Sequence, residues 1–209
     1  RLLFQTAAAR FNSGEFTVIS GQMAAGKTCL AKLLAGLQAC TKGQISCDGR
    51  LLRRSTDFRK ARIRLSHQNP ASQIIGHTVL AELEWAELNE RADSDPRDLA
   101  FGEQRRLALA IALAEEPTFL LLDDPFLGLD QAFVPKLLRC LVERHQAGKG
   151  VLLFSNDIEK VLAHADRQVL LKQGRVIADA LPERVLPYLD AHGFRKPTMK
   201  LAEMSWLKD

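Results

Sequence analysis

The sequence has no stretch that is long and apolar enough to cross a membrane. Its longest uninterrupted apolar run, LALAIALA, covers residues 107–114, whereas a membrane-spanning helix needs about 20 apolar residues. The start of the sequence also lacks the basic and then apolar pattern of a secretory leader. We therefore expect any membrane role of this chain to come through a partner.

Cysteine is scarce, and the four cysteines form no C-x-x-C pair and have no histidine at metal-ligand spacing. This pattern argues against a metal site and makes a disulfide framework the weaker interpretation. We expect reduced, mostly buried thiols in a cytosolic protein. The residues concerned are Cys29, Cys40, Cys47 and Cys140.

Internal repeats and low-complexity segments are also absent. The 209 residues, 46% hydrophobic and 26% charged, suffice for one good core or two small lobes. The net charge of +4 and the pI near 9.0 suit a surface near anionic lipid or nucleic acid. The 29 basic residues are spread widely, however, and the tight cluster RKARIR at residues 59–64 is typical of a solvated face.

Residues 21–28 read GQMAAGKT and match the phosphate-loop pattern G-x-x-x-x-G-K-[ST]. Gly21 and Gly26 let the backbone curl so that its N–H groups point at phosphates. Lys27 adds a positive charge near the β- and γ-phosphates, and the Thr28 hydroxyl is placed to ligate Mg²⁺. The motif predicts that the chain holds a nucleoside triphosphate. The expected contacts are Gly21, Gln22, Met23, Ala24, Ala25, Gly26, Lys27, Thr28 and Cys29.

The context of the loop supports this interpretation. A short apolar, β-branched run at residues 16–20 predicts a buried strand before it, and helical spacing at residues 27–38 predicts a helix after it. The free N–H groups and dipole of a helix N-terminus favour phosphate. Further strand-like runs, with helical patterns between the later ones, indicate an α/β parallel sheet. They lie at residues 62–66, 118–122, 151–155 and 167–172.

Three other segments have readable patterns. Asp48 and Gly49 separate two apolar stretches within residues 44–52, which predicts a hairpin and a small antiparallel layer. Residues 78–93 are helical and acidic in pattern, before Ser, Asp and Pro break the helix. Near the C-terminus, residues 183–192 predict one further helix.

A second acidic motif, FLLLDDP, covers residues 119–125. Four apolar residues predict a strand, and Asp123 at its end would hold Mg²⁺ through water. Asp124 would polarise the attacking water. Alone, the motif fits a strand ended by two solvated acids, but the phosphate loop upstream favours the functional interpretation.

The order of motifs resembles that of the ATP-binding subunits of ABC transporters over almost the whole chain. GQMAAGKT corresponds to Walker A and FLLLDDP to Walker B. HQNP at residues 67–70 resembles the Q-loop, so the resemblance implies Gln68 as an Mg²⁺ ligand. LGLD at residues 127–130 resembles the D-loop, with Asp130, and Asn156 lies where the switch histidine would be. The amino-acid sequences of residues 68–89 and 192–204 look most like those of energy-coupling-factor and cobalt-type importers.

The resemblance implies a P-loop NTPase fold of ABC ATPase type. We expect a mostly parallel sheet with helices on both faces and a small N-terminal antiparallel β layer. The ATP-binding domain would cover residues 1–181 and a helical tail residues 182–209. A helical insert would span about residues 70–115, and it is shortened because the stretch from Gln68 to Leu99 leaves room for little more than one long helix.

The signature-like segment, which in the family faces the ATP of a partner subunit, departs from the usual LSGGQ. Ala100 removes a hydroxyl, Phe101 places a bulky residue where the backbone should approach phosphate, and Glu103 brings negative charge toward the nucleotide. The segment consists of Leu99, Ala100, Phe101, Gly102 and Glu103.

Two catalytic positions also differ from the family pattern. Asp124 is one methylene shorter than the usual glutamate, and Asn156 has no titratable proton. The residues expected to act on the γ-phosphate are Lys27, Asp124 and Asn156, whereas Thr28, Gln68 and Asp123 would hold the metal. We therefore expect binding of ATP and Mg²⁺ to survive and hydrolysis to be weak or to depend on a partner.

The leading hypothesis is an ATP-binding subunit of an energy-coupling-factor-like importer of a vitamin or metal ion, driven by ATP-dependent dimer closure. It would lie on the cytoplasmic face of the membrane with a second ABC ATPase subunit, identical or different, and a transmembrane subunit. The alternative is a regulatory or structural ATP-binding module that dimerises without productive hydrolysis. Nucleic acid is a disfavoured partner, since the chain has neither a long coiled-coil insertion nor tandem cassettes.

Overall fold

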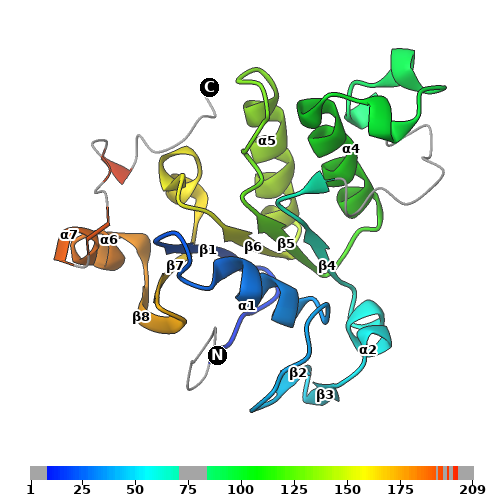
Figure 1. Cartoon of the computed structure of the whole chain (residues 1–209). Helices are drawn as coiled ribbons and strands as arrows, with labels where there is room; N and C mark the ends of the chain where they lie inside the picture. Colours follow the sequence, from blue (N-terminus) through cyan, green and yellow to red (C-terminus); the bar gives the residue numbers. More distant parts are fainter. Residues whose placement is uncertain (1–8, 71–83, 192, 195–196, 198–199, 202–209) are drawn as a thin grey trace.

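A six-stranded sheet forms the centre of the structure, a computed structural model that describes residues 9–70, 84–191, 193–194, 197 and 200–201. The strands lie in the order β4-β5-β6-β1-β7-β8, and all neighbours are parallel except β7 and β8 (Figure 1). They are β1 (Phe16–Gly21), β4 (Ile63–Ser66), β5 (Phe119–Asp123), β6 (Gly150–Phe154), β7 (Arg167–Lys172) and β8 (Arg175–Ala180). Each of the five runs predicted from sequence is a strand, whereas β8 is an addition.

Helices cover both faces of this sheet, as expected for parallel strands (Figure 1). One face carries α1 (Lys27–Leu34), and the other carries α4 (Phe101–Ala114) and α5 (Phe133–Gln146). Because side chains alternate along a strand, β5 contributes Leu120 and Leu122 to the core under α4 and α5. Leu121 belongs to the core under α1. The predicted α/β fold class is confirmed.

The predicted hairpin consists of β2 (Ile45–Cys47) and β3 (Arg50–Leu52), followed by the short helix α2 (Ser55–Lys60). Asp48 and Gly49 connect the strands with φ values of 49° and 75°. Two consecutive left-handed residues form the turn type that matches strand twist. The small antiparallel layer is therefore confirmed.

Two predicted helices are shorter than expected. α1 ends at Leu34 and not at residue 38, because Gly36 takes a left-handed φ of 70° just beyond it. The helix predicted to run to residue 93 is wrong in its described part, where only Glu84 and Trp85 are helical and Glu87 has a φ of 59°. The chain then forms 3-10 turns η2 (Asn89–Arg91) and η3 (Pro96–Asp98). Residues 71–83 of the expected insert lie outside the described residues.

The C-terminal part also differs from the prediction of one helix at residues 183–192. It forms two short helices, α6 (Pro182–Val185) and α7 (Tyr188–Ala191). Pro187 separates them, since proline has no N–H for a continuing helix. Val185 and Leu189 of these helices join the core under α4 and α5. The connection between β6 and β7 consists of 3-10 turns η4 (Ile158–Lys160) and η5 (Leu162–His164).

The four cysteines are free thiols, as expected, but the prediction that most of them are buried is wrong. Cys40 is exposed, and Cys29, Cys47 and Cys140 are half-buried. Cys29 and Cys140 lie within α1 and α5, Cys47 lies on β2 of the small hairpin, and Cys40 lies between α1 and β2.

Within the described parts of the chain, no helix combines the length and apolar character needed to cross a membrane.

Candidate nucleotide-binding site

The phosphate loop begins where β1 ends, between the neighbouring strands β6 and β7. A Cβ on Gly21 would lie 2.6 Å from the carbonyl oxygen of Leu171, so the position has no room for a side chain. Ala24 and Gly26 have φ values of 62° and 105°, and the latter immediately precedes α1. The loop therefore has the curled backbone expected of a phosphate cradle.

Lys27 points back into this loop and is only 8% exposed. Its Nζ donates hydrogen bonds to the carbonyl oxygens of Gly21 at 2.7 Å and Gln22 at 3.3 Å, and to Oδ1 of Asn156 at 3.1 Å. Burial lowers the pKa of Lys27, while the carboxylates of Asp124 and Asp123 act to raise it. The structure thus brings together the predicted Lys27, Asn156 and the two acids.

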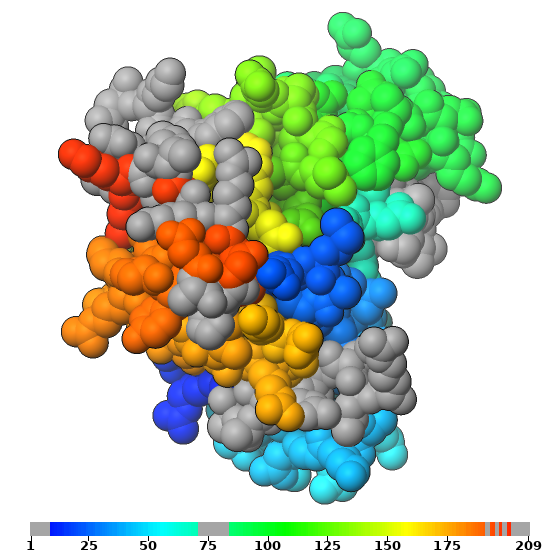
Figure 2. All heavy atoms as spheres, turned by 60° about the vertical axis from the view of Figure 1, so that its left-hand side comes forward, coloured from blue at the N-terminus to red at the C-terminus, as the bar shows by residue number. Residues whose placement is uncertain are grey.

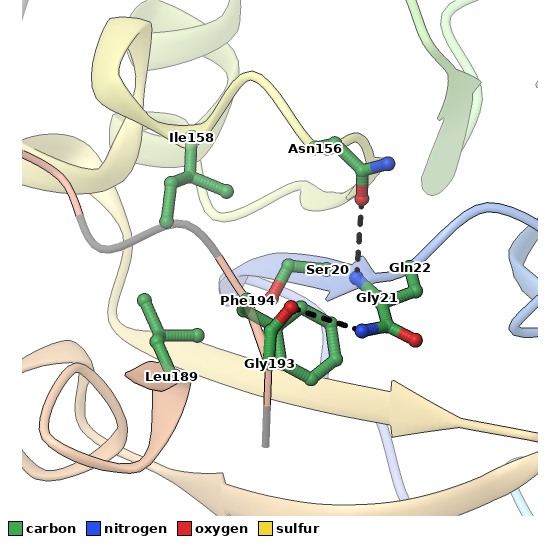
Figure 3. A pocket seen from close by; sticks show the side chains of 8 residues that line it. All are labelled: Ser20, Gly21, Gln22, Asn156, Ile158, Leu189, Gly193 and Phe194. Carbon is green, nitrogen blue, oxygen red and sulfur yellow. Dashed lines mark hydrogen bonds between the residues drawn. The ribbon is translucent and has the colours of Figure 1, made fainter. Parts of the chain in front are cut away.

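Asn156 follows β6 and faces the start of the loop (Figure 3). The backbone N–H of Gly21 donates to its Oδ1 at 3.3 Å. The side-chain oxygen therefore accepts from both Gly21 and Lys27. The expectation that Asn156 acts on the γ-phosphate of a bound nucleotide stays a prediction.

Asp123 ends β5 and is 1% exposed. Burial raises its pKa, and the nearby Thr28 hydroxyl opposes that rise without reaching hydrogen-bond geometry. Among the described residues, neither carboxylate oxygen has a hydrogen-bond partner. Two buried oxygens without partners beside a hydroxyl fit a divalent cation, because Mg²⁺ prefers oxygen ligands. The predicted ligands Asp123 and Thr28 thus lie together.

Asp124 has a φ of 45°, which is uncommon for a residue with a side chain. Its N–H donates to the carbonyl oxygen of Phe154 at 2.8 Å, and its Oδ1 accepts from the Ser155 hydroxyl at 2.8 Å. These bonds hold the second acid next to the end of β6, on the same edge of the sheet as Lys27.

Arg105 was missed by the sequence reasoning, although it is 0% exposed beside the two acids. Its guanidinium donates to the carbonyl oxygens of Gln68 at 3.0 Å and Asp123 at 2.8 Å, and also to those of His67 and Asp124. Burial lowers the pKa of Arg105 to about 10, against the raising effect of Asp123 and Asp124. A signal was available, because Arg105 precedes the core residue Leu109 by four positions and so shares its helix face.

The signature-like segment forms the start of α4. Glu103 does not extend freely toward a nucleotide, because its Oε2 accepts the backbone N–H of Ala100 at 2.8 Å and so caps α4. Phe101 is 48% exposed, and its ring lies 2.4 Å from where a Cβ on Gly128 would be. Within the described chain, no hydrogen bond or ion pair joins residues 99–103 to residues 21–28.

Asp130 of the D-loop-like segment links the same helix to α5. Its Oδ1 accepts the backbone N–H of Phe133 at 2.8 Å, and its Oδ2 pairs with Nη1 of Arg106 at 3.1 Å. The roles of these predicted residues at a partner's nucleotide stay predictions.

The C-terminal part reaches the phosphate loop, which the sequence did not indicate. Nε2 of Gln22 donates to the carbonyl oxygen of Gly193 at 2.9 Å, beside a hollow of about 210 Å³ (Figure 3). Figure 2 shows these C-terminal residues, in orange and red, against the blue N-terminal region. The hollow is lined by Ser20, Gly21, Gln22, Asn156, Ile158, Leu189, Gly193 and Phe194.

Solved ABC ATPase structures share this fold. CbiO1 from Clostridium perfringens, described as part of the ABC transporter complex cbiONQ, matches with a TM-score of 0.69 and 26% identity, over 86% of this chain and 82% of that chain. A dimeric ATP-binding cassette in a post-hydrolysis state, bound to ADP and Pi, matches with a TM-score of 0.71 and 26% identity, over 83% and 88%. The strand, loop and acidic strand end thus define a P-loop ATPase of ABC type.

Sequence comparisons agree with the fold. The ABC transporter family profile matches residues 4–127. The energy-coupling factor transporter ATP-binding protein EcfA2 of Thermotoga maritima is 32% identical over 206 residues, which are 88% of this chain and 77% of the relative. The aliphatic sulfonates import ATP-binding protein SsuB 3 of Paraburkholderia xenovorans is 36% identical over 186 residues, covering 83% and 72%. The chain belongs to the ABC transporter family, in its ATP-binding branch, as the motif order predicted.

Proposed function

We propose that this chain is the ATP-binding, weakly hydrolysing subunit of an energy-coupling-factor-like importer of a vitamin or metal ion. The observation that carries the proposal is the phosphate loop with buried Lys27 beside Asp123, whose carboxylate oxygens lack partners. The names of the similar EcfA2 and CbiO1 support the transporter type. The subunit would lie on the cytoplasmic face of the membrane, with a transmembrane subunit and a second ABC ATPase.

The residues of the loop bind and orient the triphosphate in this proposal. The N–H groups of residues 21–28 and the Lys27 ammonium would contact the phosphates. Thr28, Gln68 and Asp123 would hold Mg²⁺, which when bound neutralises charge on the phosphate oxygens.

Weak hydrolysis follows from the groups that would act on the attacking water. Asp124 reaches less far than a glutamate, and its Oδ1 already accepts from Ser155 at 2.8 Å. Asn156 cannot take up or release a proton. Nucleotide binding depends mainly on the phosphate loop. The departures at Asp124 and Asn156 therefore affect the transition state of hydrolysis more than the bound ground state.

Substitution of Lys27 tests nucleotide binding directly. Mg²⁺-ATP at 100 times its dissociation constant should raise the free energy of unfolding of the unmodified chain by about 2.7 kcal/mol. Lys27→Ala should abolish the shift, whereas Lys42→Ala, which removes an exposed lysine, should retain it. Thermal or urea unfolding with and without millimolar nucleotide measures this. If ATP leaves the unmodified chain unshifted, the proposed function is wrong.

Restoring the family residues tests the account of weak hydrolysis. Asp124→Glu combined with Asn156→His should raise kcat about tenfold or more in the presence of the partner subunits, because a well-placed base contributes 10²–10⁴-fold. Steady-state phosphate release measures this rate. Co-purification with a membrane protein and a second ATPase tests the assembly. Nucleotide-dependent dimerisation without a membrane partner, and with no gain in rate, would instead support a regulatory ATP-binding module.

A further inference from the structure

Arg105 is the largest fully buried side chain in the described chain. A buried cation is normally paired with an acid, since an unpaired charge is costly to desolvate. Within the described residues, Arg105 forms no ion pair, and its hydrogen bonds all go to main-chain carbonyl oxygens. Such a cation holds backbone in place, and it leaves the two carboxylate oxygens of Asp123 without a hydrogen-bond partner among the described residues.

The four carbonyl groups belong to two loops that continue neighbouring strands. β4 and β5 pair up to Ser66 and Leu122. Nη1 of Arg105 bonds to residues 67 and 68 beyond β4, and Nη2 bonds to residues 123 and 124 at the end of β5. The guanidinium thus joins the two chains where the pairing of the strands stops.

We propose that Arg105 is a positioning residue for the metal side of the nucleotide site. Its planar group fixes the main chain of Gln68 relative to that of Asp123, so that both side chains can reach one divalent cation on a bound nucleotide. The inference rests on the proposed function, because it assigns Arg105 to the site that binds ATP with a metal ion.

The geometry of the side chain makes this proposal specific. Arginine presents five N–H donors in a rigid plane, whereas a lysine ammonium is a single point on a flexible stem. Arg105→Lys keeps the charge beside Asp123 and Asp124 but cannot bond to both loops in the same way. Outer-shell residues of metal sites typically contribute 10–100-fold to metal affinity or activity.

Arg144 offers a matched control. It is 8% exposed on α5, and its Nη2 donates to the carbonyl oxygen of Pro117, which lies before the opposite end of β5. Arg144→Lys therefore also alters a buried arginine that is bonded to the main chain next to β5. Its contact lies at the end of β5 opposite to the predicted metal ligand Asp123.

The experiment uses the full chain and three readouts. Arg105→Lys should raise the Mn²⁺ concentration for half-maximal binding in the presence of ATP about tenfold or more. ATP affinity measured in EDTA should stay within about twofold, since the phosphate loop is unchanged. Amide hydrogen exchange without nucleotide should become faster in residues 67–69 and at Asp123 and Asp124. Arg144→Lys should change neither the Mn²⁺ dependence nor exchange in these two segments.

Equal effects of the two variants on Mn²⁺ dependence would overturn the proposal. It would also be overturned if Arg105→Lys lost ATP affinity in EDTA by as large a factor as it lost Mn²⁺ affinity. If Arg105→Lys does not fold, the unmodified chain still decides the question. ATP with Mn²⁺ should slow exchange in both loops together, and slowing in only one loop contradicts the link. If the unmodified chain binds no ATP, the proposed function fails, while the exchange of the nucleotide-free variant still tests whether Arg105 holds the two loops.

Discussion

Arg167 shows how one side chain can join segments that are distant in the sequence. Its guanidinium binds both carboxylate oxygens of Asp179 on β8, at 2.5 and 2.6 Å, and Glu15 before β1 at 3.0 Å. It also donates to the carbonyl oxygen of Arg10 at 2.6 Å. Burial raises the pKa of Glu15, but the hydrogen bonds from Thr17, Asn12 and Arg167 together lower it by more than burial raises it. The net shift of this pKa is therefore downward.

We expect Arg167→Gln to lower the free energy of unfolding at pH 7 by about 2 kcal/mol, the order of a lost hydrogen bond to a charged group. Since the folded-state pKa of Glu15 lies below its ordinary 4.5, its ionised form stabilises the fold above that pH. This stabilisation is lost as the pH falls through the lowered pKa. The difference between variant and unmodified chain should therefore shrink below pH 4.5.

Urea unfolding of both proteins at pH 7 and in steps below pH 4.5 measures the effect. Arg184→Gln is the control, because Arg184 is exposed and forms no ion pair within the described chain. A loss of stability that is independent of pH would contradict the role given to Glu15.

The site could be predicted from sequence only where its residues are adjacent along the chain. The loop around Lys27 and the acid pair at Asp123 are each contained in one strand-to-loop segment, and the structure brings the two acids close enough to Lys27 for their charges to act on its pKa. Helical spacing could place Arg105 on the buried face of α4, but its contacts could not be predicted, because they go to carbonyl groups of two loops that only the assembled sheet brings together. The contact of Gln22 with Gly193 spans most of the chain and has no local signal.

At the scale of elements, the start of α4 packs against the loop that follows β5. Gly128 has a φ of 78°, and a Cβ there would lie 2.4 Å from the Phe101 ring. A Cβ on Gly102 would lie 2.7 Å from the Gly128 carbonyl oxygen. The pair of Arg106 and Asp130 at 3.1 Å holds the same two segments. The unusual Phe101 thus packs within its own chain.

Gly128→Ala should destabilise the chain for two reasons. A left-handed alanine costs about 1–2 kcal/mol, and the overlap with Phe101 adds about 1–3 kcal/mol. In a Phe101→Ala background the overlap is gone, so Gly128→Ala should cost about 1–3 kcal/mol less there. A double-mutant cycle from urea unfolding measures the difference. Additivity within about 0.3 kcal/mol would show that the ring does not contact Gly128 in solution.

Element types were more predictable than element ends. Strand patterns located β1 and β7 because alternating or continuous apolar runs depend on burial that the sheet provides. Helix ends depended on single residues: Gly36 ends α1 and Pro187 divides the C-terminal helix. β8 was not expected, although Gln173 and Gly174, with φ values of 49° and 74°, form the left-handed turn before it. This Gln-Gly pair is a weaker turn signal than Asp48-Gly49.

At the scale of the whole molecule, the sheet separates two apolar cores with different neighbours. The core under α1 contains Ala25, Leu30 and Ala31 and supports the phosphate loop. The core under α4 and α5 contains Leu138 and Leu141 and supports the opposite face. Two adjacent residues of one central strand therefore pack into different cores, and replacing each of them tests a different core.

Leu152 and Leu153 of β6 provide the test, since they are 2% and 0% exposed and belong to the α1 core and the α5 core respectively. Either leucine replaced by alanine should lower the free energy of unfolding by about 2–5 kcal/mol, because each change leaves a cavity. Only Leu152→Ala should weaken ATP binding several-fold, since its cavity lies beneath the helix that begins at Lys27. Unfolding curves and ATP titrations at a temperature where both variants are folded separate the two effects. Equal ATP affinity in the two variants would mean that the phosphate loop keeps its geometry without support from this core.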